Sequence, residues 1–489
     1  MIRTFPELFM QITETYAVRP AIVSDGRTLP FGELRERVLI LAAELARRGI
    51  RPGTRVGVLL RNSPEFVIAY WAALVSGAIA VPLNDHYQQN EILYFIDECE
   101  LSLILTDESY RALCESVLPQ AKTHCDILVS ESWDVLNFDS SWQPPTIDAN
   151  SPVMFQFSSG STGRPKRIAR NHTQLLWELD ALKNTLGLRP EDRFLGVAPF
   201  SHVNGLMRSM LASFRAGASL YPVAHFDRHR VAGLIEQEQL TVFIAVPFMF
   251  IVLAETRFDP APKFGLRWCI SASAPLPLKY NRLFHDKFGI YIRQLYGSTE
   301  TGTMSVNLSD DITDTLDSVG APLPEIEFAI VNDNAQRVET GMVGQVIVSS
   351  PGAIRGYDGL PELNAQVFRD GFFFTGDLGR LDEEGRLYLQ GRLKFLINKS
   401  GFKIDPREVE SVLEEHPGVD KVAVVGVATS YGDEKVKAVI VRRGPCTEVE
   451  LAEFCRGKIA DFKIPSVFEF LEEMPTSPTG KIRRALLTQ

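Results

Sequence analysis

The chain is poor in cysteine and has no excess of positive charge. Its 489 residues include six cysteines, with no C-x-x-C pair and no regular spacing. This pattern favours reduced thiols over disulfides or a zinc site. Lysine and arginine total 51 against 61 aspartates and glutamates, which gives a formal net charge of −10. The overall charge therefore gives no reason to expect nucleic acid or an anionic membrane as a partner.

The chain also lacks a secretory signal and an uninterrupted membrane-spanning run. Glu7 and Glu14 fall where a signal peptide would need an apolar core, which favours a cytoplasmic protein. An uncharged stretch runs from Phe66 to Leu83, but a glycine and a proline divide it. We interpret it as a buried helix followed by a short strand over 78–81, and expect no membrane span.

Helix and strand patterns alternate over roughly the first 300 residues. Leu34, Val38, Leu41 and Leu45 recur at helical spacing, and a strand over 56–60 follows them. Such alternation predicts a parallel sheet covered by helices on both faces. Further strands of this kind are expected over 242–246, 266–271 and 290–295.

After residue 318 the pattern changes to short strands separated by glycines. This pattern predicts an antiparallel, all-β unit that could close a small barrel. Its strands are expected over 327–331, 344–349, 372–375 and 386–390.

The last hundred residues are mixed again. A helix is predicted over 406–415, with Asp405 as its N-cap and Glu408 completing a capping box. The other elements expected here are strands over 421–427 and 436–441 and a helix over 448–460. The predicted fold class is thus α/β: a large N-terminal domain, residues 1–391, of α/β subdomains plus a small β-barrel, then a small mobile α+β C-terminal domain, residues 392–489.

A loop rich in glycine and hydroxyl groups follows the β-rich run from Val153 to Phe157. Its residues are Ser158, Ser159, Gly160, Ser161, Thr162 and Gly163, with Lys166 shortly after. Glycine lets the backbone approach an anion, the hydroxyls donate hydrogen bonds, and the lysine adds a point charge, so the loop suits a polyphosphate. The spacing is not that of a Walker loop, and the composition alone also fits a solvated turn.

Four further segments carry suitable chemistry. Y-G-S-T-E-T-G, beginning at Tyr296, places a hydroxyl beside a carboxylate, as Mg²⁺ bound to phosphate oxygens would require. T-G-D, ending at Asp377, offers a carboxylate to a ribose diol. G-R-L-K, ending at Lys394, falls at the expected domain join, and Lys481 lies in a loop of proline and glycine near the C-terminus. Each of these alone also fits a solvated turn or surface residue.

Taken together, these segments resemble the adenylate-forming superfamily: acyl- and aryl-CoA ligases, adenylation domains of peptide synthetases, and beetle luciferases. Five motifs occur in the family's order, from L-P-F-G-E-L near Leu29 to the terminal G-K-I-R-R. The resemblance covers essentially the whole chain. It implies an AMP-forming acid–thiol ligase that uses ATP and Mg²⁺.

The resemblance assigns the ATP site residue by residue. The loop 158–166 would hold the β- and γ-phosphates, and Thr299 and Glu300 would lie near the α-phosphate, with Glu300 on Mg²⁺. Lys481 would bridge the attacking carboxylate and the α-phosphate; it is expected to be catalytic, as are Thr299, Glu300 and His202. The other expected nucleotide-binding residues are Ala274, Tyr296, Gly297, Asp377 at the ribose, and Arg392 at the ribose and phosphate.

The acid pocket is assigned in the same way. In the family a histidine, here His202, gates the carboxylate end of the pocket. The other expected wall residues are Gly205, Phe248, Ser271, Ser273 and Thr303. Amino-acid-activating relatives place an aspartate shortly after this histidine, whereas this chain has Val203 to Leu206. Because an unpaired α-ammonium would be costly there, we expect a small carboxylic acid without an α-amine.

The thiol step is expected to need a moving C-terminal domain. Lys394 matches the family's hinge, although Phe395 follows it where an acidic residue is common. Ser400, Gly401 and Phe402 match the loop that lines the pantetheine tunnel. The acceptor is expected to be coenzyme A or, alternatively, the phosphopantetheine of a carrier protein.

Two other hypotheses remain at this stage. A catalytically silent ligand-binding relative is disfavoured because the chain keeps all of Thr299, Glu300, Asp377, Arg392 and Lys481. Luciferase-like oxygenation is disfavoured on its rarity alone. The identity of the acid, the oligomeric state and the pathway stay open.

Overall fold

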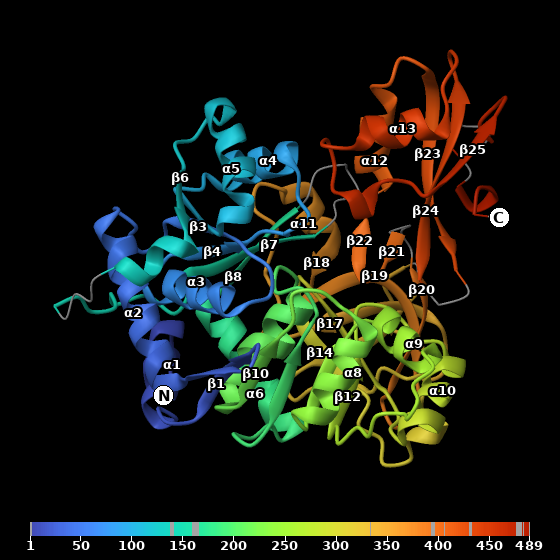
Figure 1. Cartoon of the computed structure of the whole chain (residues 1–489). Coiled ribbons are helices and arrows are strands. Elements are labelled where there is room, and N and C mark those ends of the chain that lie inside the picture. The colour runs from blue at the N-terminus through green and yellow to red at the C-terminus, as the bar shows by residue number, and fades with distance from the viewer. Residues whose placement is uncertain are drawn as a thin grey trace.

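The computed structural model describes residues 2–136, 141–158, 166–332, 334–392, 397–404, 406–429, 433–475, 482 and 484–488. Two mainly parallel sheets and one antiparallel sheet make up most of the molecule, and the chain ends in a separate lobe that carries α12, α13 and β23 to β25 (Figure 1). The predicted α/β class, with a large N-terminal part and a small C-terminal part, is confirmed.

The first sheet has six strands in the order β6-β5-β3-β4-β7-β8. All neighbouring strands are parallel except β7 and β8, which form an antiparallel pair. The strands are β3 Arg55–Leu59, β4 Ile79–Pro82, β5 Leu103–Thr106, β6 Asp126–Val129, β7 Pro152–Ser158 and β8 Lys166–Asn171. The helices along this sheet are α3 Pro64–Val75, α4 Gln89–Cys99 and α5 Glu108–Val117.

The helix α3 and the strand β4 account for the uncharged stretch that begins at Phe66. The Ser63 hydroxyl caps α3 by accepting a hydrogen bond from the Phe66 amide at 3.1 Å. All ten residues from Phe66 to Val75 are buried, so the stretch forms part of the protein core. No helix in the described ranges is long and apolar enough to cross a membrane.

The second sheet has nine strands in the order β15-β14-β13-β12-β11-β9-β10-β1-β2. Its six central strands, β13 to β1 in this order, run parallel, and the strands at both ends are antiparallel. The strands are β1 Pro20–Ser24, β2 Arg27–Pro30, β9 Arg193–Gly196, β10 Ser219–Pro222, β11 Val242–Ala245, β12 Trp268–Ser271, β13 Arg293–Ser298, β14 Gly302–Val306 and β15 Ala321–Pro322. The strand predicted over 290–295 thus begins three residues later and runs into the Y-G-S motif.

Helices pack against this sheet and link it to the first one. They are α1 Phe5–Thr15, α2 Phe31–Arg47, α6 His172–Leu186, the π-helix η3 Asn204–Leu211, α7 Ala212–Ala216, α8 Arg228–Gln237, α9 Pro247–Glu255 and α10 Leu278–Phe288. The four leucine and valine positions predicted for the helix after residue 30 are all buried in α2.

The predicted β-barrel is an open antiparallel sheet in the described residues. Its strands are β16 Glu327–Val331, β17 Gly344–Ser349, β18 Phe368–Arg369, β19 Phe372–Leu381 and β20 Leu387–Arg392, with α11 Pro361–Val367 before β18. The start of β19 pairs with β18 and its end pairs with β20. No pairing of β16 with β20 is found among these residues, so the ladder does not close on itself.

The C-terminal lobe begins with a short hairpin, β21 Ile397–Lys399 and β22 Phe402–Ile404. A three-stranded sheet follows, made of β23 Val419–Ala428, β24 Glu434–Arg442 and β25 Val467–Leu471, with α12 Pro406–Glu414 and α13 Glu448–Cys455. The expected N-cap Asp405 lies outside the described residues. The prediction of a helix over 448–460 was too long, because Gly457 adopts a left-handed conformation (φ +74°) two residues after α13 ends.

His172, at the start of α6, makes the stability of the fold dependent on pH. Its side chain is 2% exposed, and its Nδ1 accepts the Phe5 amide hydrogen at 3.1 Å. Burial lowers the pKa of His172 to about 4, against the pull of Glu7 and Asp148. Between pH 6.5 and 4 the unfolded chain binds a proton that the folded chain does not, so stability falls as the pH falls.

Urea unfolding at several pH values between 7 and 4 should therefore show a loss of about 3 kcal/mol from this group. A His172→Gln variant should have a shallower pH dependence over this range. A matching His124→Gln variant, at a side chain that is 86% exposed, should keep the wild-type slope. Equal slopes in all three proteins would refute the assignment.

Candidate active site

The β7–β8 hairpin places Lys166 beside the Y-G-S-T-E motif. Ser158 and Lys166 are paired in register at the ends of the two strands. The Lys166 ammonium lies 4.8 Å from the centre of the Tyr357 ring, and the Tyr357 hydroxyl donates to Glu300 Oε1 at 2.9 Å. Two residues predicted to serve the phosphates and the metal thus share one aromatic neighbour. Several other predicted site residues lie outside the described residues: Ser159, Gly160, Ser161, Thr162, Gly163, Lys394 and Lys481.

The residues predicted to bind the nucleoside come together from three strands. The Tyr296 hydroxyl, on β13, donates to Asp377 Oδ2 on β19 at 2.5 Å. Asp377 is buried, and its backbone pairs in register with that of Arg392 on β20. Gly297 follows Tyr296 on β13, and Ala274 lies in the loop after β12, the next strand of the sheet. The structure therefore brings together three positions that were predicted to bind the nucleoside, Tyr296, Asp377 and the backbone of Arg392.

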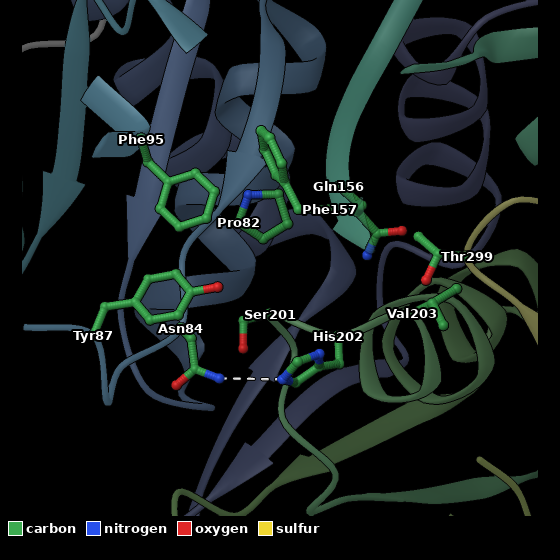
Figure 2. A pocket seen from close by; sticks show the side chains of 10 residues that line it. All are labelled: Pro82, Asn84, Tyr87, Phe95, Gln156, Phe157, Ser201, His202, Val203 and Thr299. Carbon is green, nitrogen blue, oxygen red and sulfur yellow. Dashed lines mark hydrogen bonds between the residues drawn. The ribbon is translucent and has the colours of Figure 1, made fainter. Parts of the chain in front are cut away.

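His202 lines a pocket together with Thr299 (Figure 2). Its Nε2 is 3.1 Å from the Asn84 amide nitrogen, so the ring nitrogen serves as acceptor when that amide donates. The pKa of His202 is lowered to about 4, chiefly by burial and in smaller part by the nearby Lys463 and His86. The imidazole is therefore neutral at pH 7. The other lining residues are Pro82, Tyr87, Phe95, Gln156, Phe157, Ser201 and Val203.

Gly205 lies one turn after His202, at a point where the backbone leaves no room for a side chain. A Cβ at this position would come within 2.2 Å of the Ala198 carbonyl oxygen and 2.3 Å of that of Pro199. Asn62 fixes the same segment by donating to the Gly196 and Ala198 carbonyls at 3.0 and 2.9 Å. The path of the chain into η3 therefore depends on glycine.

A Gly205→Ala variant should lose roughly 1–3 kcal/mol of unfolding free energy, because the methyl group forces backbone atoms apart. The matched control is Gly233→Ala in α8, where the nearest atom to the new Cβ would be 3.9 Å away. That variant should gain about 0.5–1 kcal/mol from helix propensity. Urea denaturation of the three proteins measures both effects; a Gly205→Ala protein as stable as wild type would contradict the packing argument.

The other predicted wall residues lie on neighbouring elements of the nine-stranded sheet. Ser271 ends β12 and is buried, and Ser273 follows it with a left-handed backbone (φ +79°) that a serine rarely adopts. Phe248, on α9, packs its ring on Phe226. Thr303, on β14, is fully buried and hydrogen-bonds within a cluster of charged side chains. The residues next to Thr303 in the sequence did not predict this cluster.

The predicted thiol-acceptor loop lies directly against His202. The Phe402 ring is 5.2 Å from the His202 ring in an edge contact and stacks on Phe462 at 4.1 Å. Gly401 has φ +87°, and a Cβ there would be 2.6 Å from the Val246 side chain. Ser400 is fixed by Asp433, which accepts hydrogen bonds from its amide at 2.6 Å and its hydroxyl at 2.9 Å. The loop from the C-terminal lobe thus closes over the predicted acid gate.

Lys463 joins the two parts of the molecule and was missed in the sequence. Its ammonium donates to Glu91 Oε1 on α4 and to Glu408 Oε1 on α12, both at 2.7 Å. Burial alone would lower the pKa of Lys463, but the two carboxylates outweigh it and raise that pKa. Glu408 was predicted only as part of a helix capping box, and Glu91 and Lys463 are 372 positions apart. Only the folded chain reveals this contact.

The β7–β8 hairpin beside the Tyr296–Asp377 pair, and a C-terminal lobe in contact with His202, place these residues as the resemblance to adenylate-forming enzymes leads us to expect. Residues 9–358 match the AMP-binding enzyme family, and residues 408–481 match the AMP-binding enzyme C-terminal domain. The chain belongs to the AMP-binding enzyme family.

Named relatives agree with this assignment. The chain is 31% identical to the oxalate–CoA ligase of Arabidopsis thaliana, over 99% of this chain and 98% of the relative. Two solved structures of the o-succinylbenzoate CoA synthetase of Bacillus subtilis also match. The one bound to a product analogue has a TM-score of 0.90 at 27% identity, with 98% of each chain covered. The one in complex with the acyl-adenylate intermediate has a TM-score of 0.72 at 28% identity, with 99% of this chain and 98% of the synthetase chain covered.

Proposed function

We propose that this enzyme activates a small carboxylic acid with ATP and transfers the acyl group to coenzyme A. The observation that carries the proposal is the contact between Phe402 of the thiol loop and His202 of the acid gate, 5.2 Å between ring centres. Adenylation is proposed to need Lys481 of this lobe at the site, so an arrangement that presents Phe402 to His202 instead supports a second, thiol-dependent step. The CoA ligases among its relatives support the same reading.

The chemistry runs in two half-reactions. A carboxylate oxygen attacks the α-phosphorus of ATP, the bond to the β-phosphate oxygen breaks, and pyrophosphate leaves. The thiolate of the acceptor then attacks the acyl carbon, and AMP leaves as the carbonyl is restored. Lys166 and the loop 158–166 are proposed to hold the departing phosphates. Lys481 is proposed to offset the repulsion between the two anions in the first step.

His202 has a positioning role in this scheme. Because its imidazole is neutral at pH 7, it adds no charge to the pocket where the carboxylate must react. The Asn84 amide fixes the ring through Nε2 at 3.1 Å. We assign these two residues to orienting the acid and excluding water at the carboxylate end.

Mg²⁺ fits this site only together with the nucleotide. One oxygen of Glu300 accepts the Tyr357 hydroxyl, and the carboxylate is an oxygen donor of the kind that Mg²⁺ prefers. In the ranges that the structure describes, no three acidic, histidine or cysteine side chains gather as a metal cage. Glu300 would therefore hold the ion against phosphate oxygens, where the metal would neutralise charge on the phosphates.

The position of the C-terminal lobe supports assigning this structure to the thiol-transfer stage of the proposed cycle. The product-analogue structure of the synthetase matches this chain with a TM-score of 0.90, against 0.72 for the acyl-adenylate structure of the same enzyme. We place the boundary between the two domains after residue 391, so that residues 1–391 bind ATP and acid and residues 392–489 move. Lys394 is the proposed hinge.

All six cysteines are buried and unpaired, which favours a reducing compartment such as the cytoplasm.

An acid panel tests the function. The purified enzyme is offered ATP, Mg²⁺ and carboxylic acids of several classes, and pyrophosphate release is measured with and without coenzyme A. Release of pyrophosphate without any added acid would refute the proposal. So would a failure of every acid in the panel to stimulate that release. Acylation of a phosphopantetheine carrier protein with free coenzyme A inert would assign the acceptor to a carrier instead.

A further inference from the structure

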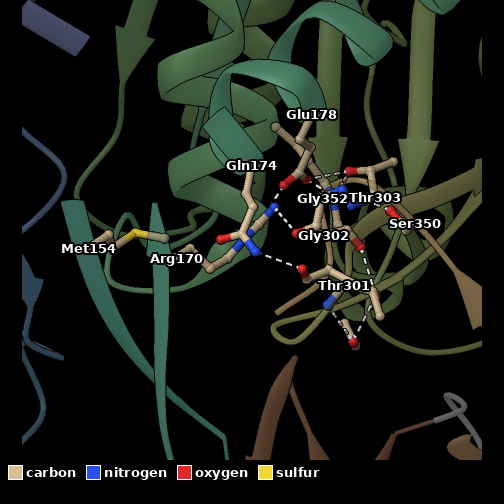
Figure 3. Close-up of polar contacts among 12 residues, drawn as sticks. Met154, Arg170, Gln174, Glu178, Thr301, Gly302, Thr303, Ser350 and Gly352 are labelled. Carbon is tan, nitrogen blue, oxygen red and sulfur yellow. Dashed lines mark hydrogen bonds and ion pairs between the residues drawn. The ribbon is translucent and has the colours of Figure 1, made fainter. Parts of the chain in front are cut away.

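A cluster of buried charges lies where Thr303 was expected to form the acid pocket (Figure 3). Glu178, on α6, accepts from the Thr303 amide at 2.8 Å and from its hydroxyl at 2.9 Å through Oε1. Its other oxygen accepts from Arg170 Nη1 at 2.6 Å, and Arg170 Nη2 donates to the Gly352 carbonyl at 2.9 Å. Both side chains of this ion pair are at most 1% exposed. These bonds tie α6 to the β-strands around it, and among the described residues they leave Arg170 Nε as the nitrogen of this ion pair without a hydrogen-bond partner.

A second arginine enters the cluster from η3. Arg208 is 1% exposed; its Nε donates to Thr303 Oγ1 at 3.0 Å and its Nη1 to Asn204 Oδ1 at 3.4 Å. Its Nη2 and the Asn204 amide nitrogen have no hydrogen-bond partner in the described ranges. Two buried N–H donors on adjacent side chains are thus left unused. The π-helical form of η3 is itself a feature that recurs at functional sites.

The charges in this cluster do not balance. Two guanidinium groups, Arg170 and Arg208, share one carboxylate, Glu178, whose direct ion pair goes to Arg170. The pKa of Arg208 is lowered to about 10, chiefly by burial, with Glu178 opposing the shift and Arg170 adding to it, so the group remains protonated at pH 7. A buried cation with an unused donor is costly unless a partner arrives. The missing partner is an anion.

The unused donor of Arg208 lies beside residues that were predicted to bind the acid or the nucleotide. Gly297, in the Y-G-S-T-E motif, faces Arg208 so closely that a Cβ there would be 2.2 Å from Nη2. Thr303, the predicted wall residue, bonds to the same guanidinium. Gly205, another predicted wall residue, lies on η3 between Asn204 and Arg208. The donors are therefore bordered by residues expected to bind the acid.

We infer that the acid carries a second anionic oxygen group, such as a second carboxylate, that binds to Arg208 Nη2 and the Asn204 amide. This inference rests on the proposed acid activation and names its substrate class. A guanidinium beside an amide donor matches the paired oxygens of a carboxylate. Arg208 would then determine specificity, while Glu178 and Thr303 position its guanidinium.

The test uses pairs of acids that share a carbon skeleton, for example pentanoate with glutarate and benzoate with isophthalate. The wild-type enzyme should show kcat/KM for pyrophosphate release at least about 100-fold higher with the better diacid than with its monoacid partner. The monoamide of that diacid should behave like the monoacid. A monoamide as good as the diacid, or a preference for monoacids, would overturn the inference and leave acid activation intact.

Variants separate recognition from packing. Arg208→Met should lower kcat/KM for the preferred diacid by roughly 100-fold and leave the value for the monoacid within a few-fold. Arg170→Met, on the far side of Glu178, should lower the melting temperature and keep the diacid-to-monoacid ratio. An equal loss for both acids in Arg208→Met would mean a structural role or contact with the reacting carboxylate, and would overturn the inference. Should that variant not fold, the wild-type ratios decide. No pyrophosphate with any acid would refute the proposed function itself.

Discussion

Replacing Lys481 with alanine should slow acyl-adenylate formation by roughly 10²–10³-fold and leave the thiol step nearly unchanged. Lys481 lies outside the described residues, and its role follows from the terminal G-K-I-R-R motif. The reacting carboxylate and the α-phosphate are both anions, so a cation between them stabilises the transition state more than the ground state. In the thiol step the lobe presents Phe402 instead, and this lysine has no assigned contact there.

The two steps can be measured separately. Pyrophosphate exchange reports adenylation, and thioester formation from supplied acyl-adenylate reports transfer to coenzyme A. Lys458→Ala is a suitable control, since Lys458 is a surface lysine of the same lobe paired with Glu415 at 3.0 Å. That variant should perform both steps like the wild type. Equal losses in both steps for Lys481→Ala would contradict the assigned role.

Replacing Lys463 with methionine should have the opposite effect on the two steps, slowing the thiol step far more than adenylation. The change leaves the buried carboxylate of Glu91 and the partly buried carboxylate of Glu408 without their shared cation. Removing one partner from a buried ion pair commonly costs 3–5 kcal/mol, which would make the closed arrangement roughly 10²–10³-fold rarer. The thioester step should slow accordingly, because this arrangement is the one in which Phe402 contacts His202 in the structure.

Adenylation should be far less affected in the Lys463→Met variant, since its proposed residues do not include this lysine. The matched control is Lys458→Met, which removes an exposed ion pair within one lobe and should change neither step. Single-turnover transfer from acyl-adenylate measures the effect. A variant that transfers at the wild-type rate would show that the Lys463 ion pairs do not hold the lobe in place.

Local patterns in the sequence predicted much of the fold. The helix α3 follows from a serine cap, a proline and a continuous apolar run, and β16 and β17 were predicted with the observed bounds. The family could also be recognised, because its motifs occur in order along the whole chain. Each of these signals is contained within a few consecutive residues, which is why a single sequence reveals it.

Features that depend on distant partners could not be predicted. The strands β8 and β25 were missed because their residues form strands by pairing with β7 and β24. The expected barrel does not close in the described residues, where β20 pairs with the end of β19 and, through Leu387, with Gly320, but not with β16. The same holds at the site. Arg208 was not predicted as a site residue, because its proposed role depends on Thr303, 95 positions away, and on Glu178, which is already paired with Arg170.

The position of Glu408 would limit the cost of the proposed lobe movement. Glu408 and Lys463 both belong to the C-terminal lobe, so they would travel together in the proposed swing, and Glu91 would stay behind. The lysine would then keep one counterion throughout the proposed cycle. Each swing would exchange a single ion pair for hydration, which would keep the free-energy difference between the two arrangements small.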